Sequence, residues 1–379
     1  MPTANQGVTT VQDGSNRSRG GTGLLRPAKA TRRTLRIRRA GPRIAGLAIS
    51  DSASVLSQEQ VLERLGLAGD EFAQGIFERC GVKTRHLNLS PDFLSRTLQG
   101  RAHQIEEDLL QHSIKAVDGL GIDPARIGTV LSASLYSLGG PTLAHRLVNH
   151  YAMDPTTDKY HVTGVGCASG VPLMRLAGQA LRDHPEKYAL VVAAESMSGI
   201  LTQASPGDHR AKVIGSAIFG DGCAAALLSA DQHSEGPTIV ASQVHQIPDS
   251  LGAVRLQFTG DDGYLHLARE LPDLAGEGLQ EVTDTFLSHH RLSRDQIDHW
   301  IVHPGGRRII ENVRDALELD DNQVASSWNA LASHGNVGTP SILYVLKEVI
   351  EQNQPEPGER GLMVTVGPGV TVGLMLLDW

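Results

Sequence analysis

Two kinds of hydrophobic pattern alternate along most of the chain. Short apolar or β-branched runs predict strands, which we place at 44–49, 128–132, 160–163, 188–194, 223–229 and 238–242. Between most of them apolar residues recur every three or four positions, as Ile105 and Leu109 do within 101–120, and predict amphipathic helices. Another helix is expected to begin near Ser57, where Gln60 is placed for a capping box. Strands that alternate with helices predict an α/β fold.

The second half of this pattern repeats the first. The predicted strand in 126–132 leads through two glycines into a helix, and 296–302 does the same at an offset of 170 residues. Nearly the same offset carries Cys167 to within one position of Asn336. Successive elements that match at one offset indicate a duplicated unit. If the halves pack about a pseudo-twofold axis, Cys167 and Asn336 should lie at equivalent helix N-termini that face one site.

The repeat also includes a later strand and suggests the domain boundaries. The run Leu190–Ala194 matches Leu362–Val366. We expect an N-terminal half over 41–232, which carries the nucleophile, and a C-terminal half over 233–379. Residues 1–40 are rich in Gly, Ser, Thr and Arg and predict a disordered basic extension. A transit peptide, or a patch for nucleic acid or membrane, is the alternative for this segment.

Composition narrows the classes of function. The chain has 379 residues, 40% hydrophobic and 20% charged, a balance typical of globular proteins. A formal net charge of −8 argues against general nucleic-acid binding. No apolar run reaches membrane-spanning length, and no signal-peptide core follows Met1. The three cysteines are too widely spaced for a disulfide framework or a paired-cysteine zinc site. We therefore expect a cytoplasmic protein without a metal.

One of the cysteines stands in a setting suited to chemistry. The segment His161–Gly170 passes from a β-rich run through two glycines to Cys167, and helical spacing follows. At the first residues of a helix, the positive end of the dipole favours a thiolate and should lower the thiol pKa. His303 follows the predicted strand 297–302 and precedes Pro304–Gly306, so it is placed at a strand end above a glycine turn. A buried structural cysteine is the alternative interpretation.

Cys167, His303 and Asn336 together point to acyl transfer. A thiolate can accept an acyl group, and a nearby imidazole can hold it as an ion pair near neutral pH. Asn336 can donate neutral hydrogen bonds, which suit the oxyanion of a thioester carbonyl. Because the set has no carboxylate partner, acyl transfer with carbanion chemistry fits better than hydrolysis. Decarboxylation of a malonyl thioester generates an enolate that such donors would stabilise.

Five motifs extend this set, and together they resemble type III polyketide synthases, the chalcone/stilbene synthase-like branch of the thiolase fold. The motifs are Gly166–Gly170, Phe219–Gly222, Val302–Gly306, Gly335-Asn336 and Gly367–Gly369. The resemblance implies a thiolase-like α/β fold, a duplicated five-layered αβαβα unit with pseudo-twofold halves. It implies catalytic roles for Cys167, His303 and Asn336. It also implies a homodimer that uses acyl-CoA starters and malonyl-CoA extenders, with no resident cofactor; an acyl carrier protein stays open as a donor.

The same resemblance assigns eight residues to substrate binding, namely Arg79, Ser134, Thr202, Leu265, Gly306, Gly367, Pro368 and Gly369. Relatives often carry two bulky phenylalanines at the positions of Thr202 and Leu265, and another at Val366. A cavity without these rings offers no stacking surface, so we expect an aliphatic acyl starter. The alternative for Leu265 is simple packing in the core.

A basic turn is a further candidate for contact with coenzyme A. Arg79, Lys83 and Arg85 lie at the position where relatives bind the coenzyme A phosphates, and the guanidinium fork suits phosphate. The alternative is a solvated basic turn with no ligand.

The leading interpretation is an acyltransferase that loads a starter on Cys167, extends it with malonyl-CoA by decarboxylative Claisen condensation and cyclises the product. A single-round condensation of the ketoacyl synthase III type, or acyl transfer between two acyl thioesters, is the enzymatic alternative. A non-catalytic dimer partner of an active homologue is a third, which the intact set of Cys167, His303 and Asn336 argues against.

Overall fold

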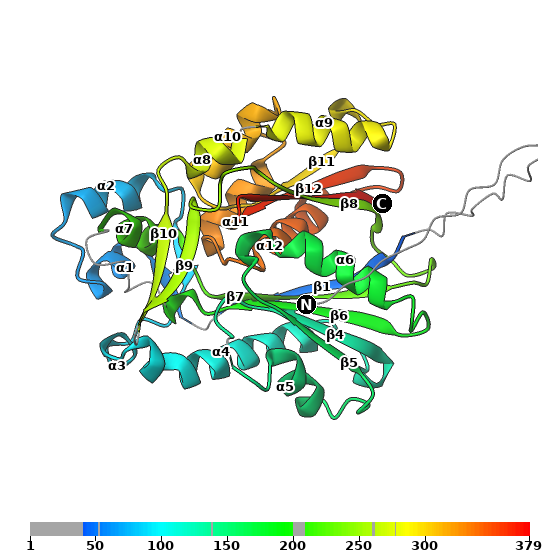
Figure 1. Cartoon of the computed structure of the whole chain (residues 1–379), viewed down its shortest axis with the longest axis horizontal. Coiled ribbons are helices and arrows are strands. Elements are labelled where there is room, and N and C mark those ends of the chain that lie inside the picture. Colours follow the sequence, from blue (N-terminus) through cyan, green and yellow to red (C-terminus); the bar gives the residue numbers. More distant parts are fainter. Residues whose placement is uncertain (1–40, 52–53, 138, 200–208, 260–261, 277) are drawn as a thin grey trace, which may run out of the picture. The chain divides into compact units, whose positions relative to one another are not determined.

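The computed structural model describes residues 41–51, 54–137, 139–199, 209–259, 262–276 and 278–379 (Figure 1). The predicted basic extension, residues 1–40, lies outside the described residues. Within the described ranges, every helix is too short or too polar to cross a membrane.

Strands and helices alternate through both halves of the chain. The strands are β1 Arg43–Ser50, β2 Val55–Ser57, β3 Thr84–His86, β4 Ile127–Ala133, β5 Asp158–Val162, β6 Tyr188–Glu195, β7 Gly222–Ser229, β8 Thr238–Gln246, β9 Val254–Thr259, β10 Asp262–Leu267, β11 His299–Val302, β12 Arg360–Gly367 and β13 Thr371–Asp378. The helices are α1 Gln58–Arg64, α2 Glu71–Arg79, α3 Pro91–Ser95, α4 Leu98–Asp118, α5 Leu143–His150, α6 Gly170–Ala180, α7 His209–Ile218, α8 Leu271–Gly276, α9 Leu279–His289, α10 Arg307–Ala316, α11 Ala325–His334 and α12 Ser341–Glu348.

Nine of these strands form one sheet in the order β11-β12-β13-β8-β1-β7-β6-β4-β5. The strands β1, β4, β6 and β7 correspond in order and direction to β8, β11, β12 and β13. In each set the pair farthest from the junction of the two sets, β4 with β6 or β11 with β12, is parallel, and the other neighbours are antiparallel. The two sets meet at a bridged pair, Arg43 with Thr238. This repeated topology is the duplication that the sequence indicates.

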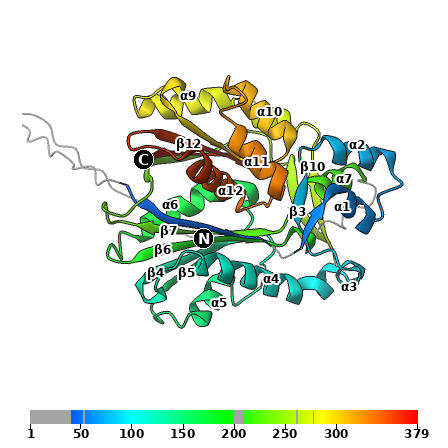
Figure 2. The same ribbon diagram turned by 180° about the vertical axis from the view of Figure 1, so that it is seen from behind.

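Helices sandwich the two sets of strands in layers (Figures 1 and 2). Helices α4 and α5 cover the outer face of the first set, and α9 and α10 lie on the outer side of the second. Helix α6 contacts β4, β6 and β7 on one side and β8, β12 and β13 on the other, while α12 contacts β1, β11 and β12. The order helix, strand, helix, strand, helix is the five-layered arrangement of the thiolase-like fold.

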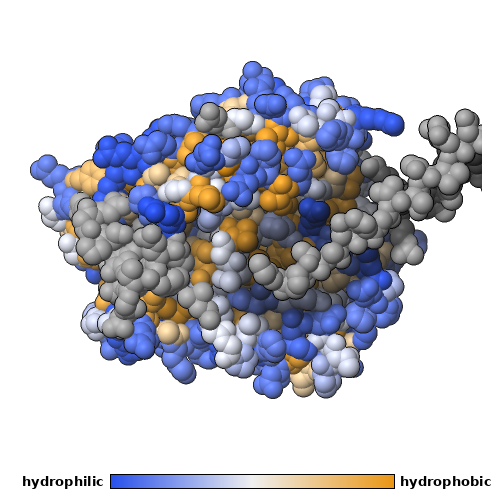
Figure 3. Space-filling view, in the orientation of Figure 1, coloured by the Kyte–Doolittle hydropathy of each residue, from blue (hydrophilic) through white to orange (hydrophobic). Residues whose placement is uncertain are grey.

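The two central helices come close to each other at a glycine. A Cβ atom on Gly170, the first residue of α6, would lie 2.3 Å from Cγ2 of Ile342 in α12. Around this point Val171, Met174 and Leu343 are fully buried in one apolar cluster. Hydrophobic residues also reach the surface between α8 and α6 on the face in Figure 3. The absence of a side chain at position 170 therefore lets the loops that precede α6 and α12 come together.

Most of the predicted elements are confirmed, and two features differ. The six strands predicted between residues 44 and 242 correspond to β1 and β4–β8, and Ser57 and Gln60 form the expected capping box at α1. Asn336, however, does not open α12, because its N–H donates to Ile218 O at 2.7 Å and holds it in the preceding loop. The β9–β10 hairpin is absent from the sequence prediction, although apolar alternation around a glycine-containing turn is a hairpin signal.

The division of the chain at 232/233 stays a prediction. That point falls in the connection between the last strand of the first set and the first strand of the second, residues 230–237.

Candidate active site

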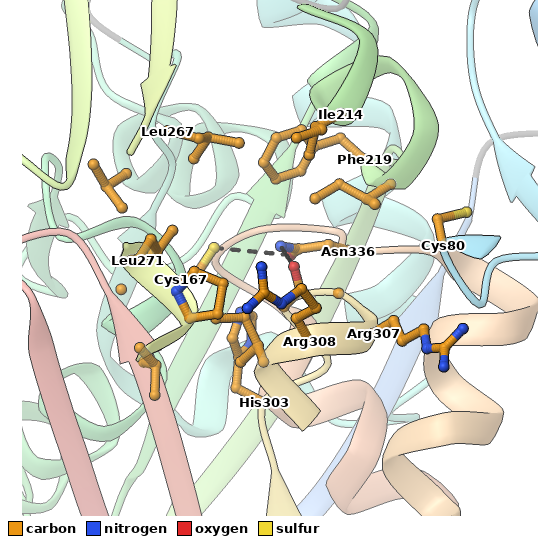
Figure 4. Close-up of a pocket in the computed structure, with 18 of the residues that line it drawn as sticks. Cys80, Cys167, Ile214, Phe219, Leu267, Leu271, His303, Arg307, Arg308 and Asn336 are labelled. Carbon is orange, nitrogen blue, oxygen red and sulfur yellow. Dashed lines mark hydrogen bonds between the residues drawn. The ribbon is translucent and has the colours of Figure 1, made fainter. Parts of the chain in front are cut away.

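A cavity of about 510 Å³ lies where the two halves meet (Figure 4). Its lining is largely apolar and includes Ile76, Leu135, Met197, Ile214, Phe219, Leu267, Leu271 and Val366. Cys167, His303 and Asn336 all border it. The structure thus brings together three residues that the sequence separates by up to 169 positions, counted from 167 to 336.

Cys167 lies in a short 3₁₀ turn, Gly166–Ala168, directly before α6. The thiol is partly exposed toward the cavity, whereas Cys80 and Cys223 are buried. A Cβ atom on Gly367 would lie 2.4 Å from the backbone nitrogen of Ala168, so the loop after β12 packs directly against the cysteine turn. Only glycine permits this approach, which gives a packing reason for the Gly367-Pro368 motif beside Cys167.

Asn336 is held by hydrogen bonds on both ends of its amide. Its Oδ1 accepts from the N–H of Gly338 at 2.9 Å and from the hydroxyl of Ser341 at 3.0 Å, while its Nδ2 donates to Gly305 O at 3.2 Å. Oδ1 also accepts a hydrogen bond from the thiol of Cys167, with Sγ 3.8 Å from Oδ1 (Figure 4). These contacts fix the orientation of the amide and leave one Nδ2 hydrogen beyond the bond to Gly305.

His303 follows β11 directly, as predicted, and its backbone N–H continues the pairing by donating to Val364 O at 2.9 Å. Burial lowers the pKa of its imidazole to about 3. Nδ1 is buried and makes no hydrogen bond within the described residues. The ring is therefore neutral at pH 7 and close to Gly305, where a Cβ atom would lie 3.0 Å from its Nε2.

A carboxylate that the sequence analysis does not name contributes to the electrostatics of this site. Glu195, the last residue of β6, is fully buried. Its carboxylate accepts hydrogen bonds from the hydroxyls of Ser134 and Thr339 and from the N–H of Leu135. Burial raises the pKa of Glu195 to about 7 despite these donors. A charged Glu195 places a negative charge close enough to Cys167 to raise the pKa of its thiol.

The expected lowering of the Cys167 pKa is wrong for the free protein. Burial, and secondarily the charge of Glu195, raise the pKa of the Cys167 thiol to about 12, while the hydrogen bond with Asn336 acts in the opposite direction. Desolvation exceeds the dipole effect because the thiol lies in an apolar cavity, and the turn before α6 is 3₁₀ rather than α-helical. The resting pair is thus a thiol with a neutral imidazole, not an ion pair.

Glu195 was within reach of sequence reasoning. It ends the apolar run 188–194, just as His303 ends 297–302. An ionisable residue at the end of a buried parallel strand is placed for a site, and the argument used for His303 applies equally to Glu195.

The predicted substrate-binding residues divide into three groups. Arg79, Gly306, Gly367 and Pro368 line the cavity. Ser134 and Gly369 are not part of its described lining: Ser134 donates to Glu195, and Gly369 O accepts from the hydroxyl of Ser250. Thr202 and the side chain of Leu265 lie outside the described residues.

The basic turn is only partly as predicted. Arg85 is fully buried, and its guanidinium donates to Ser216 O, Phe219 O and Gln58 Oε1 at 2.6–2.8 Å. Burial lowers the pKa of Arg85 to about 9. Its partners are backbone carbonyls and an amide of the core, so it is not available to a phosphate. Arg79 is exposed and borders the cavity.

Arginines absent from the prediction complete the rim. Arg210, Arg307 and Arg308 also border the cavity. In Figure 4 Arg308 is drawn among the labelled site residues, whereas Arg307 points away from them. Arg307 pairs with Glu311 at 2.8 Å, and Arg308 pairs with Asp273 at 3.5 Å. The cavity thus has apolar walls and a rim that carries positive charge from both halves.

Comparisons with known proteins agree with this arrangement. Residues 50–286 match the family described as FAE1/Type III polyketide synthase-like protein, and residues 238–378 match the C-terminal domain of chalcone and stilbene synthases. A 3,5-dihydroxyphenylacetyl-CoA synthase of Amycolatopsis balhimycina is 30% identical over 352 residues, 89% of this chain and 93% of the relative. A 1,3,6,8-tetrahydroxynaphthalene synthase of Streptomyces peucetius subsp. caesius is 31% identical over 316 residues, 79% and 81% of the two chains.

The solved structures give the same answer at the level of the fold. The crystal structure of PKS-I from the brown alga Ectocarpus siliculosus matches with a TM-score of 0.83 and 26% identity, covering 90% of this chain and 99% of that one. The two matched sequence ranges contain all five motifs that carry the resemblance. The chain therefore belongs to the type III polyketide synthase-like family of condensing enzymes.

Proposed function

We propose that the protein condenses an acyl-CoA starter with malonyl-CoA units on Cys167 and cyclises the product. The observation that carries the proposal is the convergence of a thiol, an imidazole and an amide on one apolar cavity, with Cys167 Sγ 3.8 Å from Asn336 Oδ1. Each of the three groups then has a distinct task, derived from its protonation state and hydrogen bonds.

Loading transfers the starter to the cysteine. The sulfur of Cys167 attacks the thioester carbonyl, the bond from that carbon to the CoA sulfur breaks, and CoA leaves as a thiol. His303 accepts the proton from Sγ and returns it to the CoA sulfur, a task for which a neutral imidazole is suited. Because the thiol pKa is raised, proton transfer accompanies the attack rather than preceding it.

Extension proceeds through an enolate. The bond between malonyl-CoA and its carboxylate carbon breaks, CO₂ leaves, and the electron pair moves to the thioester oxygen. Asn336 Nδ2 and the N–H of neutral His303 donate to that oxygen. The enolate carbon attacks the acyl carbonyl on Cys167, a carbon–carbon bond forms, and the bond from that carbon to the cysteine sulfur breaks. The sulfur leaves as a thiolate, which takes up one proton from water and regenerates the thiol.

Coenzyme A fits the rim of the cavity. Arg79 and Arg210 from one half and Arg308 from the other offer guanidinium groups to its phosphates. Such remote contacts are largely uniform binding, which lowers KM without changing kcat.

The starter we propose is an aliphatic acyl group. The walls that face Cys167 include Ile214, Leu267 and Leu271, and Phe219 and Tyr136 are the aromatic rings among the described lining residues besides His303. Aliphatic walls bury a flexible chain without offering the stacked faces that a planar starter would use.

The remaining parts of the proposal concern assembly and surroundings. We propose a homodimer, located in the cytoplasm, that takes CoA thioesters as substrates and needs no resident cofactor. An acyl carrier protein is an additional donor of acyl groups, and we propose that the same rim arginines bind it.

The decisive experiment is product analysis. The purified chain is incubated with malonyl-CoA and either medium-chain or cinnamoyl-type acyl-CoAs, and the products are identified by mass spectrometry, with Cys167→Ala as control. Products with two or more extensions and a ring support the proposal. One carbon–carbon bond without cyclisation would instead establish the single-round condensation, and no condensation with any starter would contradict both.

The choice of starter is tested at the cavity wall. Leu267→Phe narrows the cavity and should move the kcat/KM preference toward shorter acyl-CoAs, by roughly 10–200-fold between chain lengths. Leu251→Phe is the matched control, because Leu251 is 69% exposed and outside the cavity. A wild-type preference for the aromatic starter would overturn this part of the proposal.

A further inference from the structure

A cluster of two histidines and an aspartate lies next to the loop that carries Asn336. Asp51 follows β1, His86 is the last residue of β3, and His334 is the last residue of α11. The described residues show this trio with one potential ligand atom from each side chain, all within 4.8 Å of one another. None of the three borders the acyl cavity in its described lining.

The distances suit a shared cation. His334 Nδ1 lies 3.3 Å and His86 Nε2 lies 3.6 Å from Asp51 Oδ2, and the side chains are 15–18% exposed. Ligands at zinc distances on a tetrahedral ion are about 3.4 Å apart, which follows from bonds of about 2.0–2.1 Å. His334 Nδ1 is buried and does not reach hydrogen-bond geometry with any described residue. A cation between these atoms would bind the imidazole nitrogens and the carboxylate oxygen at once.

The surroundings of the carboxylate also resemble those of a metal ligand. The hydroxyl of Tyr344 donates to the other oxygen, Asp51 Oδ1, at 2.9 Å, which leaves Oδ2 directed at the two histidines. The same hydroxyl accepts from the N–H of Cys223 at 3.1 Å, so the tyrosine itself is fixed. Outer hydrogen bonds of this kind orient ligands in metal sites and raise their affinity.

We propose that Asp51, His86 and His334 bind a divalent transition-metal cation of the zinc class, with water completing the coordination. Two imidazoles and one carboxylate favour such a cation over Mg²⁺ or Ca²⁺, which prefer oxygen ligands. This proposal departs from the expectation of a protein without a metal, which rests on the spacing of the cysteines. A site made of two histidines and an aspartate needs no cysteine.

The site has a structural consequence for the catalytic loop. His334 stands two residues before Asn336, whose backbone donates to Ile218 O and accepts from the N–H of Gly220. His86 O accepts from the N–H of Asp221, so the same short segment contacts both histidine-bearing elements. A bound cation would link the residue after β1, the end of β3 and the end of α11, and would thereby anchor the Asn336 loop through residues outside the described cavity lining.

The test is metal binding by the full chain, produced without a histidine tag and freed of metal by a chelator. Co²⁺ is titrated and followed by its visible absorption, and Zn²⁺ is titrated by calorimetry. We expect one equivalent of each and a higher thermal midpoint with Zn²⁺. His86→Asn should weaken binding by about 100-fold or more, and Tyr344→Phe by about 10–100-fold.

The control is His184→Asn, which removes a histidine paired with an aspartate, Asp158, at 3.7 Å but belonging to no such trio in the described chain. It should leave the affinity unchanged. Equal binding by wild type and His86→Asn, absence of Co²⁺ binding at micromolar concentrations, or an equal effect of Mg²⁺ would overturn the proposal. If His334→Asn does not fold, the wild-type spectrum and His86→Asn still decide. None of these readouts depends on the proposed condensation.

Discussion

The two halves of the molecule share one plan and supply different chemistry. The position that His303 occupies after β11 corresponds to Ala133 at the end of β4, and the position of Glu195 at the end of β6 corresponds to Gly367 at the end of β12. One half therefore supplies a buried carboxylate where the other supplies a glycine that permits close packing.

The helix starts differ in the same way. Cys167 stands in the turn directly before α6, whereas Asn336 stands five residues before α12 and is held by Gly338 and Ser341. The duplication places two equivalent strand and helix ends at one cavity. The two halves carry different side chains at these ends. In the proposed mechanism, Cys167 and the neighbouring charge of Glu195 come from the first half, and the neutral hydrogen-bond donors come from the second.

The substitution with the largest expected effect is at the proposed nucleophile, Cys167. Cys167→Ala should abolish extended products, because no acyl group can be held, yet it should still release CO₂ slowly from malonyl-CoA, since His303 and Asn336 remain. Product formation and ¹⁴CO₂ release are measured side by side. Loss of both activities together, in a variant that keeps its fold, would contradict the separation of tasks between the halves.

Asn336→Ala tests the donor contributed by the second half. Removal of one oxyanion donor typically lowers the rate about 10²–10³-fold, so malonyl-CoA decarboxylation should fall by that factor. Asn329→Ala, on α11 and outside the described cavity lining, is the control and should keep the wild-type rate. Decarboxylation at the wild-type rate in Asn336→Ala would remove Asn336 from the mechanism.

Gly170→Ala tests the contact between the halves. Its Cβ would lie 2.3 Å from Ile342 Cγ2, so overpacking should destabilise the fold by about 1–3 kcal/mol. Gly100→Ala in α4, where the nearest atom would be 3.4 Å away, should instead stabilise by about 0.5–1 kcal/mol. Chemical denaturation of both variants checks the signs, and equal stability of the two would show that α6 and α12 tolerate separation.

Glu195→Gln tests the charge supplied by the first half. Removal of this charge should lower the thiol pKa of Cys167, and each pKa unit raises the thiolate fraction about tenfold. Iodoacetamide should therefore label Cys167 faster in the variant than in wild type at pH 8, where Glu195 of the wild type is mostly charged. In wild type the rate should keep rising as pH increases above 7, because the thiol pKa of about 12 lies above that range.

The pH profile also discriminates between the two protonation states of the pair. If the wild-type labelling rate levels off near neutral pH, the thiol of Cys167 ionises there, and the thiolate–imidazolium ion pair expected from the sequence is correct. Faster labelling of Cys80 or Cys223 than of Cys167, with activity lost in step, would displace Cys167 as the nucleophile.

Arg79→Ala should have the smallest effect. An exposed ion pair contributes about 0.2–1 kcal/mol, so KM for acyl-CoA should rise up to about fivefold while kcat stays constant. Arg308→Ala gives the matching measurement for the second half, and Arg64→Ala, outside the cavity lining, is the control. An unchanged KM at low salt would show that Arg79 does not contact coenzyme A and belongs to a solvated turn.

The sequence was most informative where function depends on local chain geometry. Strand ends and glycine turns located Cys167 and His303, and the repeat located Asn336, because these signals are contained in short segments with a regular offset. It was least informative about charge. Arg85 looks like its neighbour Arg79 in sequence, yet one is fully buried among carbonyl groups and the other is exposed.

The sequence by itself determined the α/β alternation, the duplication and the identity of the three converging residues, since periodicity and motif spacing are properties of the chain. The tertiary structure alone decided the protonation states, because burial of Cys167, His303 and Glu195 arises from segments far apart in sequence. It also decided that Asp51, His86 and His334 meet, for no spacing connects a strand end with a helix end 283 positions later. Desolvation and long-range contact are the two quantities that a linear pattern does not contain.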